Sequence, residues 1–103
     1  MDDPLSVLEA QCEFIEDQLD DCQTQEQRNQ LRPSYVQAQL NYQRAVNKIF
    51  QANDARIADL VTQMKQAQVS LEQMVAQLAD TAKVIAAIST AVKIGTQLAS
   101  MAK

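Results

Sequence analysis

The sequence is poor in the residues that interrupt regular structure. Its 103 residues include one Gly, two Pro, two Phe, two Tyr and no Trp. Sheet proteins need Gly and Pro in their turns and favour aromatic and β-branched residues in their strands, so this composition argues against a β-sheet fold. Ala, Gln, Leu and charged residues dominate instead, which is typical of long helices. We therefore predict an all-α protein with a single helical domain over residues 1–103.

The sequence also contains no His. This absence removes the commonest metal ligand of proteins and the usual general base near neutral pH. Di-iron helical bundles need a Glu followed by a His three residues later, which this chain cannot supply. Residues 13–21 are rich in acidic side chains, and we interpret these as a solvated helix face rather than a cation site. We expect no catalytic residue, no cofactor and no metal, and predict that the protein is not an enzyme.

The cysteines are too few and too widely spaced to build a zinc site, which needs four ligands. Cys12 and Cys22 have a C-x9-C spacing that resembles one half of the twin C-x9-C helical hairpins, but residues 33–103 contain no Cys for the other half. In one continuous helix the two residues would lie ~15 Å apart along the axis, too far for an internal disulfide. We interpret both as small core residues in a reducing compartment, with disulfides between subunits as the alternative.

The first residues, Met-Asp-Asp-Pro, are acidic and lack the apolar stretch of a cleavable secretion signal. We therefore expect a cytoplasmic location, and export without such a signal stays open. The length and helical composition are similar to those of the small secreted helical hairpins of the WXG type, although no Trp-x-Gly turn is present. Bacterial secretion is the context that this similarity implies.

A long apolar repeat is the main feature that the sequence does contain. Every seventh residue from position 50 to position 99 is apolar, and a second apolar row lies three or four residues further on. The first row consists of Phe50, Ile57, Met64, Leu71, Leu78, Ile85, Val92 and Ala99. Such a heptad pattern, sustained for about seven repeats, predicts a long helix with one face packed on other helices.

A shorter repeat of the same kind covers residues 5–22 and predicts a first helix over about 4–30, with Pro4 in its first turn. Pro33 cannot donate a backbone hydrogen bond and restricts the residue before it, so we place a turn at residues 31–34. A long helix follows over about 34–102, with a bend or break considered near 53–54 and near 79–81. The predicted architecture is an extended helical hairpin with coiled-coil-like packing.

The charges of the chain are unevenly distributed. Residues 1–32 carry nine acidic and two basic side chains, a net charge of −7, whereas residues 33–103 carry seven basic and four acidic ones, a net charge of +3. We expect the two parts to neutralise each other, within a subunit or between subunits. A turn at 31–34 would pair Asp21 with Arg44 and Asp17 with Lys48.

Beyond about residue 64 the short first helix leaves the apolar row without a partner. Soluble monomers rarely expose such a stripe, so we expect a homo-oligomeric bundle, the alternative being a further fold-back of the chain near residues 79–81. The residues expected to contact other subunits, or another helical protein, are Leu71, Met74, Leu78, Ile85, Ile88, Val92, Ile94 and Leu98.

The predicted function is that of a non-enzymatic, self-associating helical module for assembly or protein interaction. Its rival is an exported or membrane-active small helical protein, such as a secretion-apparatus component or toxin accessory. That protein would contact a membrane through residues 84–102, whose apolar side chains spread around most of the helix. Nucleic acid is not an expected partner, because the basic residues are isolated and no aromatic residues are interleaved with them.

Overall fold

The computed structural model describes residues 3–51, 53–77 and 80–102. These residues form four helices: α1 (Pro4–Asp21), α2 (Gln25–Val46), α3 (Ala55–Ala76) and α4 (Thr81–Ser100). No strand occurs within the described ranges. The prediction of an all-α protein is confirmed.

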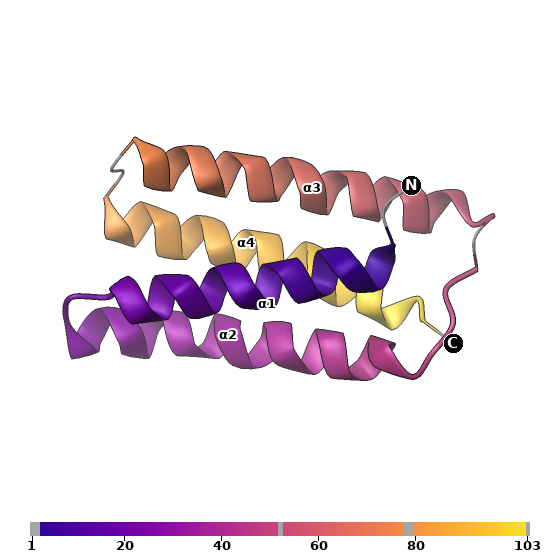
Figure 1. Cartoon of the computed structure of the whole chain (residues 1–103), viewed down its shortest axis with the longest axis horizontal. Coiled ribbons are helices and arrows are strands. Elements are labelled where there is room, and N and C mark those ends of the chain that lie inside the picture. Colours follow the sequence, from indigo (N-terminus) through magenta and orange to yellow (C-terminus); the bar gives the residue numbers. More distant parts are fainter. Residues whose placement is uncertain (1–2, 52, 78–79, 103) are drawn as a thin grey trace.

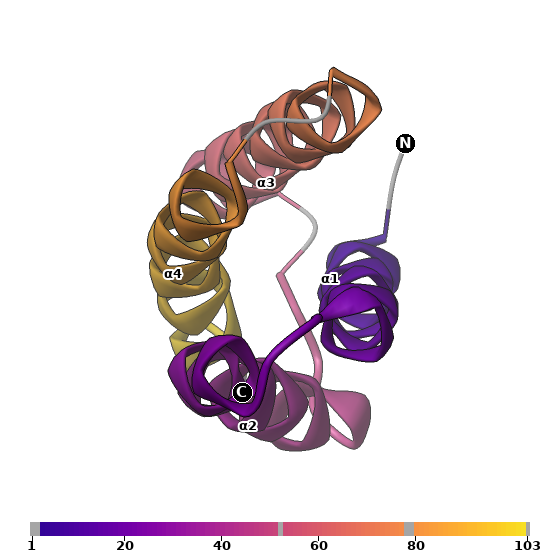
Figure 2. The same cartoon turned by 90° about the vertical axis from the view of Figure 1, so that its left-hand side faces the viewer.

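The helices form two antiparallel hairpins, one of α1 and α2 and the other of α3 and α4 (Figure 1). The hairpins pack together mainly through α2 and α4, which run in the same direction, whereas α1 and α3 approach each other less closely. Figure 2 shows the order α1, α2, α4, α3 around the bundle, with α2 and α3 diagonally opposed. The molecule is 42 Å long, far less than the ~105 Å of an unbroken helix over residues 34–103.

The first turn lies at residues 22–24 rather than at 31–34. Cys22 has an extended backbone (φ −62°, ψ 134°), which ends α1. Thr24 caps α2, because its side chain accepts a hydrogen bond from the backbone N–H of Gln27 at 3.1 Å. The Gln27 side chain in turn accepts one from the backbone N–H of Gln23 at 3.0 Å. These reciprocal bonds satisfy amide groups that a helix start would otherwise leave unpaired.

Residues 31–34, expected to form the turn, lie inside α2. Pro33 is on the exposed face of that helix, so the carbonyl that loses its hydrogen bond faces water. The neighbouring Leu31 is only 1% exposed and packs in the core, which offsets the cost of the proline. The pairs predicted from the 31–34 turn are therefore not formed, because Arg44 lies at the far end of α2 from Asp21.

The chain also turns before α3 and before α4, near the two breaks that were considered. Asp54 caps α3 by accepting from the backbone N–H of Arg56 at 2.9 Å, and Asp80 caps α4 by accepting from that of Ala82 at 3.2 Å. The long helix expected over residues 34–102 is thus three helices. Their apolar rows pack against each other and against α1 within the same chain.

The core consists of two apolar clusters with polar residues between them. The first cluster includes Leu8, Ala45, Met64 and Leu98, and the second includes Ile15, Ala38, Leu71 and Val92. Gln11 and Asn41 lie between the clusters and are 4% and 0% exposed. The Gln11 side-chain Nε2 donates to the carbonyl of Ala91 at 3.0 Å, and the Asn41 side chain lies 3.1 Å from Oγ1 of Thr96. Buried polar contacts of this kind favour one alignment of the helices over others.

Gly95 allows α1 and α4 to approach closely at this polar level. A Cβ atom at position 95 would lie 2.6 Å from Oε1 of Gln11, closer than non-bonded atoms normally come. The single glycine of the chain therefore has a packing role in the middle of α4, where its low helix propensity would otherwise be a disadvantage.

Candidate functional site

Seven of the eight predicted contact residues lie in the core of a single chain. Leu71, Ile88, Val92 and Leu98 are buried, and Met74, Ile85 and Ile94 are partly buried against the core clusters. Leu78 lies outside the described residues. These side chains contact helices of their own chain, so the apolar rows of α3 and α4 no longer require a second subunit. A membrane contact through residues 84–102 would need the buried side chains of α4 to leave this core.

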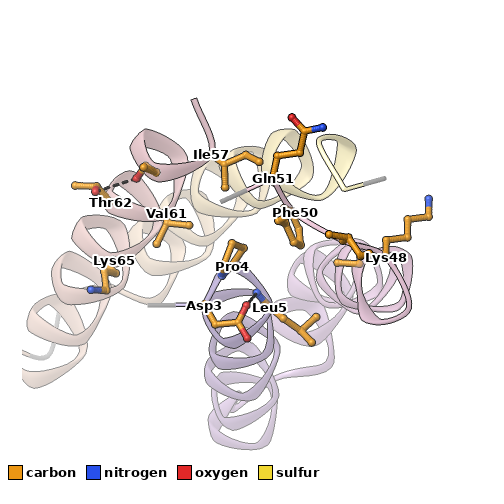
Figure 3. A pocket seen from close by; sticks show the side chains of 13 residues that line it. Asp3, Pro4, Leu5, Lys48, Phe50, Gln51, Ile57, Val61, Thr62 and Lys65 are labelled. Carbon is orange, nitrogen blue, oxygen red and sulfur yellow. Dashed lines mark hydrogen bonds between the residues drawn. The ribbon is translucent and has the colours of Figure 1, made fainter. Parts of the chain in front are cut away.

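The open side of the bundle lies between α1 and α3. At one end, a cavity of about 620 Å³ is bounded by the start of α1, the α2–α3 connection and the first turns of α3. Figure 3 shows Pro4, Phe50, Ile57 and Val61 around this cavity, with Lys48 and Lys65 on opposite sides of it. Its volume is in the range of protein ligand sites, and most of the lining side chains are apolar.

The apolar surface continues out of the cavity. Ile49, which lines it, is 75% exposed, the largest exposed fraction among the large apolar side chains of the described residues. A side chain as large as Ile gains from burial, about 1.5–3 kcal/mol when it is fully removed from water. The α2–α3 connection thus presents an apolar group that the monomer does not cover.

A second cavity, of about 390 Å³, lies further along the same side. Val7, Ala10 and Gln11 of α1 face residues of α3 across it, among them Val69, which is 52% exposed. Lys65 lines both cavities, so they adjoin. We call the two together the α1–α3 groove.

Gln11, which lines the second cavity, carries an unsatisfied polar atom in the core beside Gly95. Oε1 of Gln11 is buried and has no hydrogen-bond partner among the described residues. The Nε2 atom of the same side chain is already bonded to the carbonyl of Ala91. A buried acceptor without a partner costs stability, and this one faces Gly95 of α4, since a Cβ atom at position 95 would lie 2.6 Å from it.

Acidic residues continue along α1 beyond the groove, whose last lining residue on this helix is Gln11. Glu13, Asp17 and Asp21 are exposed and follow one another at intervals of four residues, which places them in one row on the helix. None of the acidic side chains of α1 forms an ion pair within the described part of the chain, whereas Arg56 and Asp54 at the start of α3 pair at 3.0 Å. Direct pairing inside the monomer therefore does not neutralise the charge of α1.

The chemistry of the described residues is limited. No three His, Cys, Asp or Glu side chains among them come together in a way that could hold a metal ion. Within residues 3–51, 53–77 and 80–102, no helix has both the length and the apolar character needed to cross a membrane. Cys12 and Cys22 are free thiols in α1 and at its end, half-buried and buried.

We expect Cys12 to react slowly in the folded protein. Burial, helped by the negative charge of Glu13, raises the pKa of the Cys12 thiol to about 11, whereas an unfolded thiol titrates near ~8.5. Because the thiolate is the reactive form, iodoacetamide at pH ~8 should alkylate Cys12 more slowly in the folded chain than in the denatured chain, as measured by mass spectrometry. Equal rates would contradict this packing.

The same shift implies a pH dependence of stability. The folded pKa is the higher one, so the contribution of the thiol is complete below the unfolded pKa and is lost as the pH rises towards 11. Cys12→Ser, which removes the titrating group, should make the decline in stability over this alkaline range less steep.

The fold and the groove define a small helical protein in which two hairpins pack through α2 and α4 and leave an apolar groove between α1 and α3. Comparisons with protein-family models, curated proteins and solved structures find no match for the chain.

The sequence analysis missed both the first turn and the groove. The turn has a local signal, Thr24 followed by Gln27 at the spacing of a capping box. The groove has no such signal, because its residues Val7 and Val69 lie outside the apolar rows of the sequence, and single apolar residues off a row are common on helix surfaces.

Proposed function

We propose that the protein is a non-enzymatic, self-associating helical module, and that a second copy binds in the α1–α3 groove. The observation that carries this proposal is the open apolar side of the bundle. Phe50, Ile57 and Val61 line one end of the groove, and Ile49 and Val69 are largely exposed along it. A groove between two helices is suited to a third helix that buries an apolar face in it, and coiled-coil-like packing is part of the proposal.

The distribution of charge supports a second copy as the occupant. The acidic row of α1 has no basic partner within the described part of the monomer, while residues 33–103 carry a net charge of +3. Contact between copies would allow the unpaired acidic side chains of α1 to form ion pairs with basic residues of another copy. Complementary charges of this kind also favour association over contact with unrelated proteins.

Self-association is expected to show as a mass that rises with concentration. Sedimentation equilibrium over micromolar to near-millimolar protein should give an average mass that exceeds the 11.5 kDa of one chain at the upper end of the range. A mass of one chain throughout would refute the proposal.

A variant of the groove tests its location. Ile49→Asp combined with Val69→Asp puts charge on the apolar edges, where burial of an unpaired charge is costly, and should reduce the association. Both residues are exposed, so the helical circular dichroism of the monomer should be kept. The matched control is Val46→Asp, because Val46 is 41% exposed and does not line either cavity. Equal loss in the control would place the contact elsewhere.

A further inference from the structure

We propose that the larger cavity of the α1–α3 groove binds a small amphipathic anion, a carboxylate with an unbranched apolar tail, one molecule to each chain. The tail lies in the cavity and the carboxylate at its rim, where Lys48 and Lys65 are. This inference goes beyond the proposed function, because the walls of the cavity all belong to a single chain.

The cavity offers fixed apolar walls to such a tail. Ile57 and Val61 of α3 are 5% and 8% exposed and belong to the first core cluster, which holds them in place. Pro4 at the start of α1 and Phe50 of the α2–α3 connection lie across the cavity from them (Figure 3). Water finds few hydrogen-bond partners on apolar walls, so a tail that replaces it gains free energy. The volume of about 620 Å³ suits one small molecule.

Two polar side chains of the lining are already hydrogen-bonded within the chain. Oδ1 of Asp3 accepts from the backbone N–H of Leu5 at 3.0 Å. Oγ1 of Thr62 donates to the carbonyl of Ala58 at 3.0 Å. The other uncharged polar side chain of the lining, that of Gln51, is exposed. A ligand rich in hydroxyl or amide groups would therefore leave most of them unpaired, which is costly, and an apolar body fits better.

The charged residues of the lining favour an anion. They are Lys48, Lys65 and Asp3, two positive charges and one negative in a protein of net charge −4. The two lysines lie on opposite sides of the cavity (Figure 3) and are exposed. Their aliphatic stems can extend the apolar walls while the ammonium groups stay in water at the rim. Because the stem of a lysine is flexible, its ammonium group can turn towards a carboxylate there.

The shape of the cavity favours a single molecule over a membrane surface. Three separate parts of the chain bound it: the start of α1, the α2–α3 connection and the first turns of α3. A bilayer is met by the broad apolar face of a helix, whereas a cavity between elements surrounds one tail.

Titration calorimetry with dodecanoate, kept below its micelle concentration, tests the head-group contact. The wild type should bind one molecule per chain with a Kd of about 1 mM or tighter, and acetate, which has the same head group and no tail, should not bind. Lys48→Gln with Lys65→Gln should weaken dodecanoate binding about tenfold. The matched control is Lys83→Gln with Lys93→Gln, which removes the same charge from exposed positions of α4 outside the cavity. It should change the affinity by less than about threefold, because distant exposed charges are screened.

A second pair of variants locates the tail. Ala58 is exposed and lines the cavity, so Ala58→Trp should occupy part of the space and weaken dodecanoate binding at least about tenfold. Ala86→Trp, at an exposed position of α4 outside the cavity, should leave the affinity unchanged. Helical circular dichroism shows whether both variants keep the fold.

Wild-type protein without saturable dodecanoate binding would overturn the inference. Equal losses in the variant and the control of either pair would do the same, because the binding would then not depend on this cavity. A chain that floats with phosphatidylglycerol vesicles but does not bind dodecanoate would have a membrane contact instead, which also overturns it.

A second copy would use the same end of the groove, so a bound carboxylate and a second copy exclude each other there. The two proposals nevertheless fail separately. A chain that binds dodecanoate but stays monomeric overturns only the proposed self-association. A chain that associates but does not bind dodecanoate overturns only the ligand site.

Discussion

Replacing Leu31 by Ala is expected to lower the free energy of unfolding by about 2–5 kcal/mol. Leu31 is 1% exposed and belongs to the apolar cluster that also contains Ile15 and Ile88. Truncation to Ala removes buried methyl groups and leaves a cavity that the surrounding helices fill only in part. Urea unfolding followed by circular dichroism measures the change.

The matched control for Leu31→Ala is Arg32→Ala, at the next position of the same helix. Arg32 is exposed and should change stability by no more than about 0.5 kcal/mol. The contrast between the two variants tests the position of the first turn. If residues 31–34 formed a turn, neither side chain would be deeply buried, and two small effects would contradict the helix that the structure has there.

Replacing Gly95 by Val is expected to destabilise the protein by about 1–3 kcal/mol, the usual cost of overpacking a core. A Cβ atom at this position already meets Oε1 of Gln11 at 2.6 Å and Cε of Met64 at 3.4 Å, and Val adds two methyl groups beyond it. The gain in helix propensity over Gly, a few tenths of a kcal/mol, is smaller than this cost.

The origin of the Gly95→Val effect can be checked with a second substitution. Gln11→Ala removes the amide that the new side chain would meet, so the double variant should cost less than the sum of the two single variants. Ser89→Val is the control for helix propensity, because Ser89 lies on the exposed face of α4. Additive costs for the double variant would show that the Gln11–Gly95 contact is not the cause.

Local signals account for what the sequence analysis obtained correctly. The scarcity of Gly, Pro and aromatic residues excluded strands, and the residues that the structure describes are helical apart from turns and connections. Asp54 and Asp80, which lie at the two places where a bend or break was considered, cap α3 and α4. A helix cap can be recognised in the sequence because its short side chain accepts a hydrogen bond from a backbone N–H group only two or three residues further along the chain.

The position of the first turn shows how tertiary contacts override a local preference. Pro33 is the stronger helix breaker by its covalent structure, yet α2 passes through it. The free-energy cost of a proline inside the helix is offset because Pro33 faces solvent and because Leu31 and Ala38 on the other side of α2 are almost fully buried. The break falls instead at residues 22–24, which contain no Gly or Pro.

By itself, the sequence determined that the chain forms amphipathic helices and which residues face their apolar sides, because both depend on composition and on the 3.6-residue period of the backbone. Only the tertiary structure decided which helices meet. An apolar face such as that of Leu71 and Ile88 is buried equally well by its own chain or by another copy, since the hydrophobic effect has no direction. The two short hairpins placed this face inside the monomer and left the α1–α3 side open.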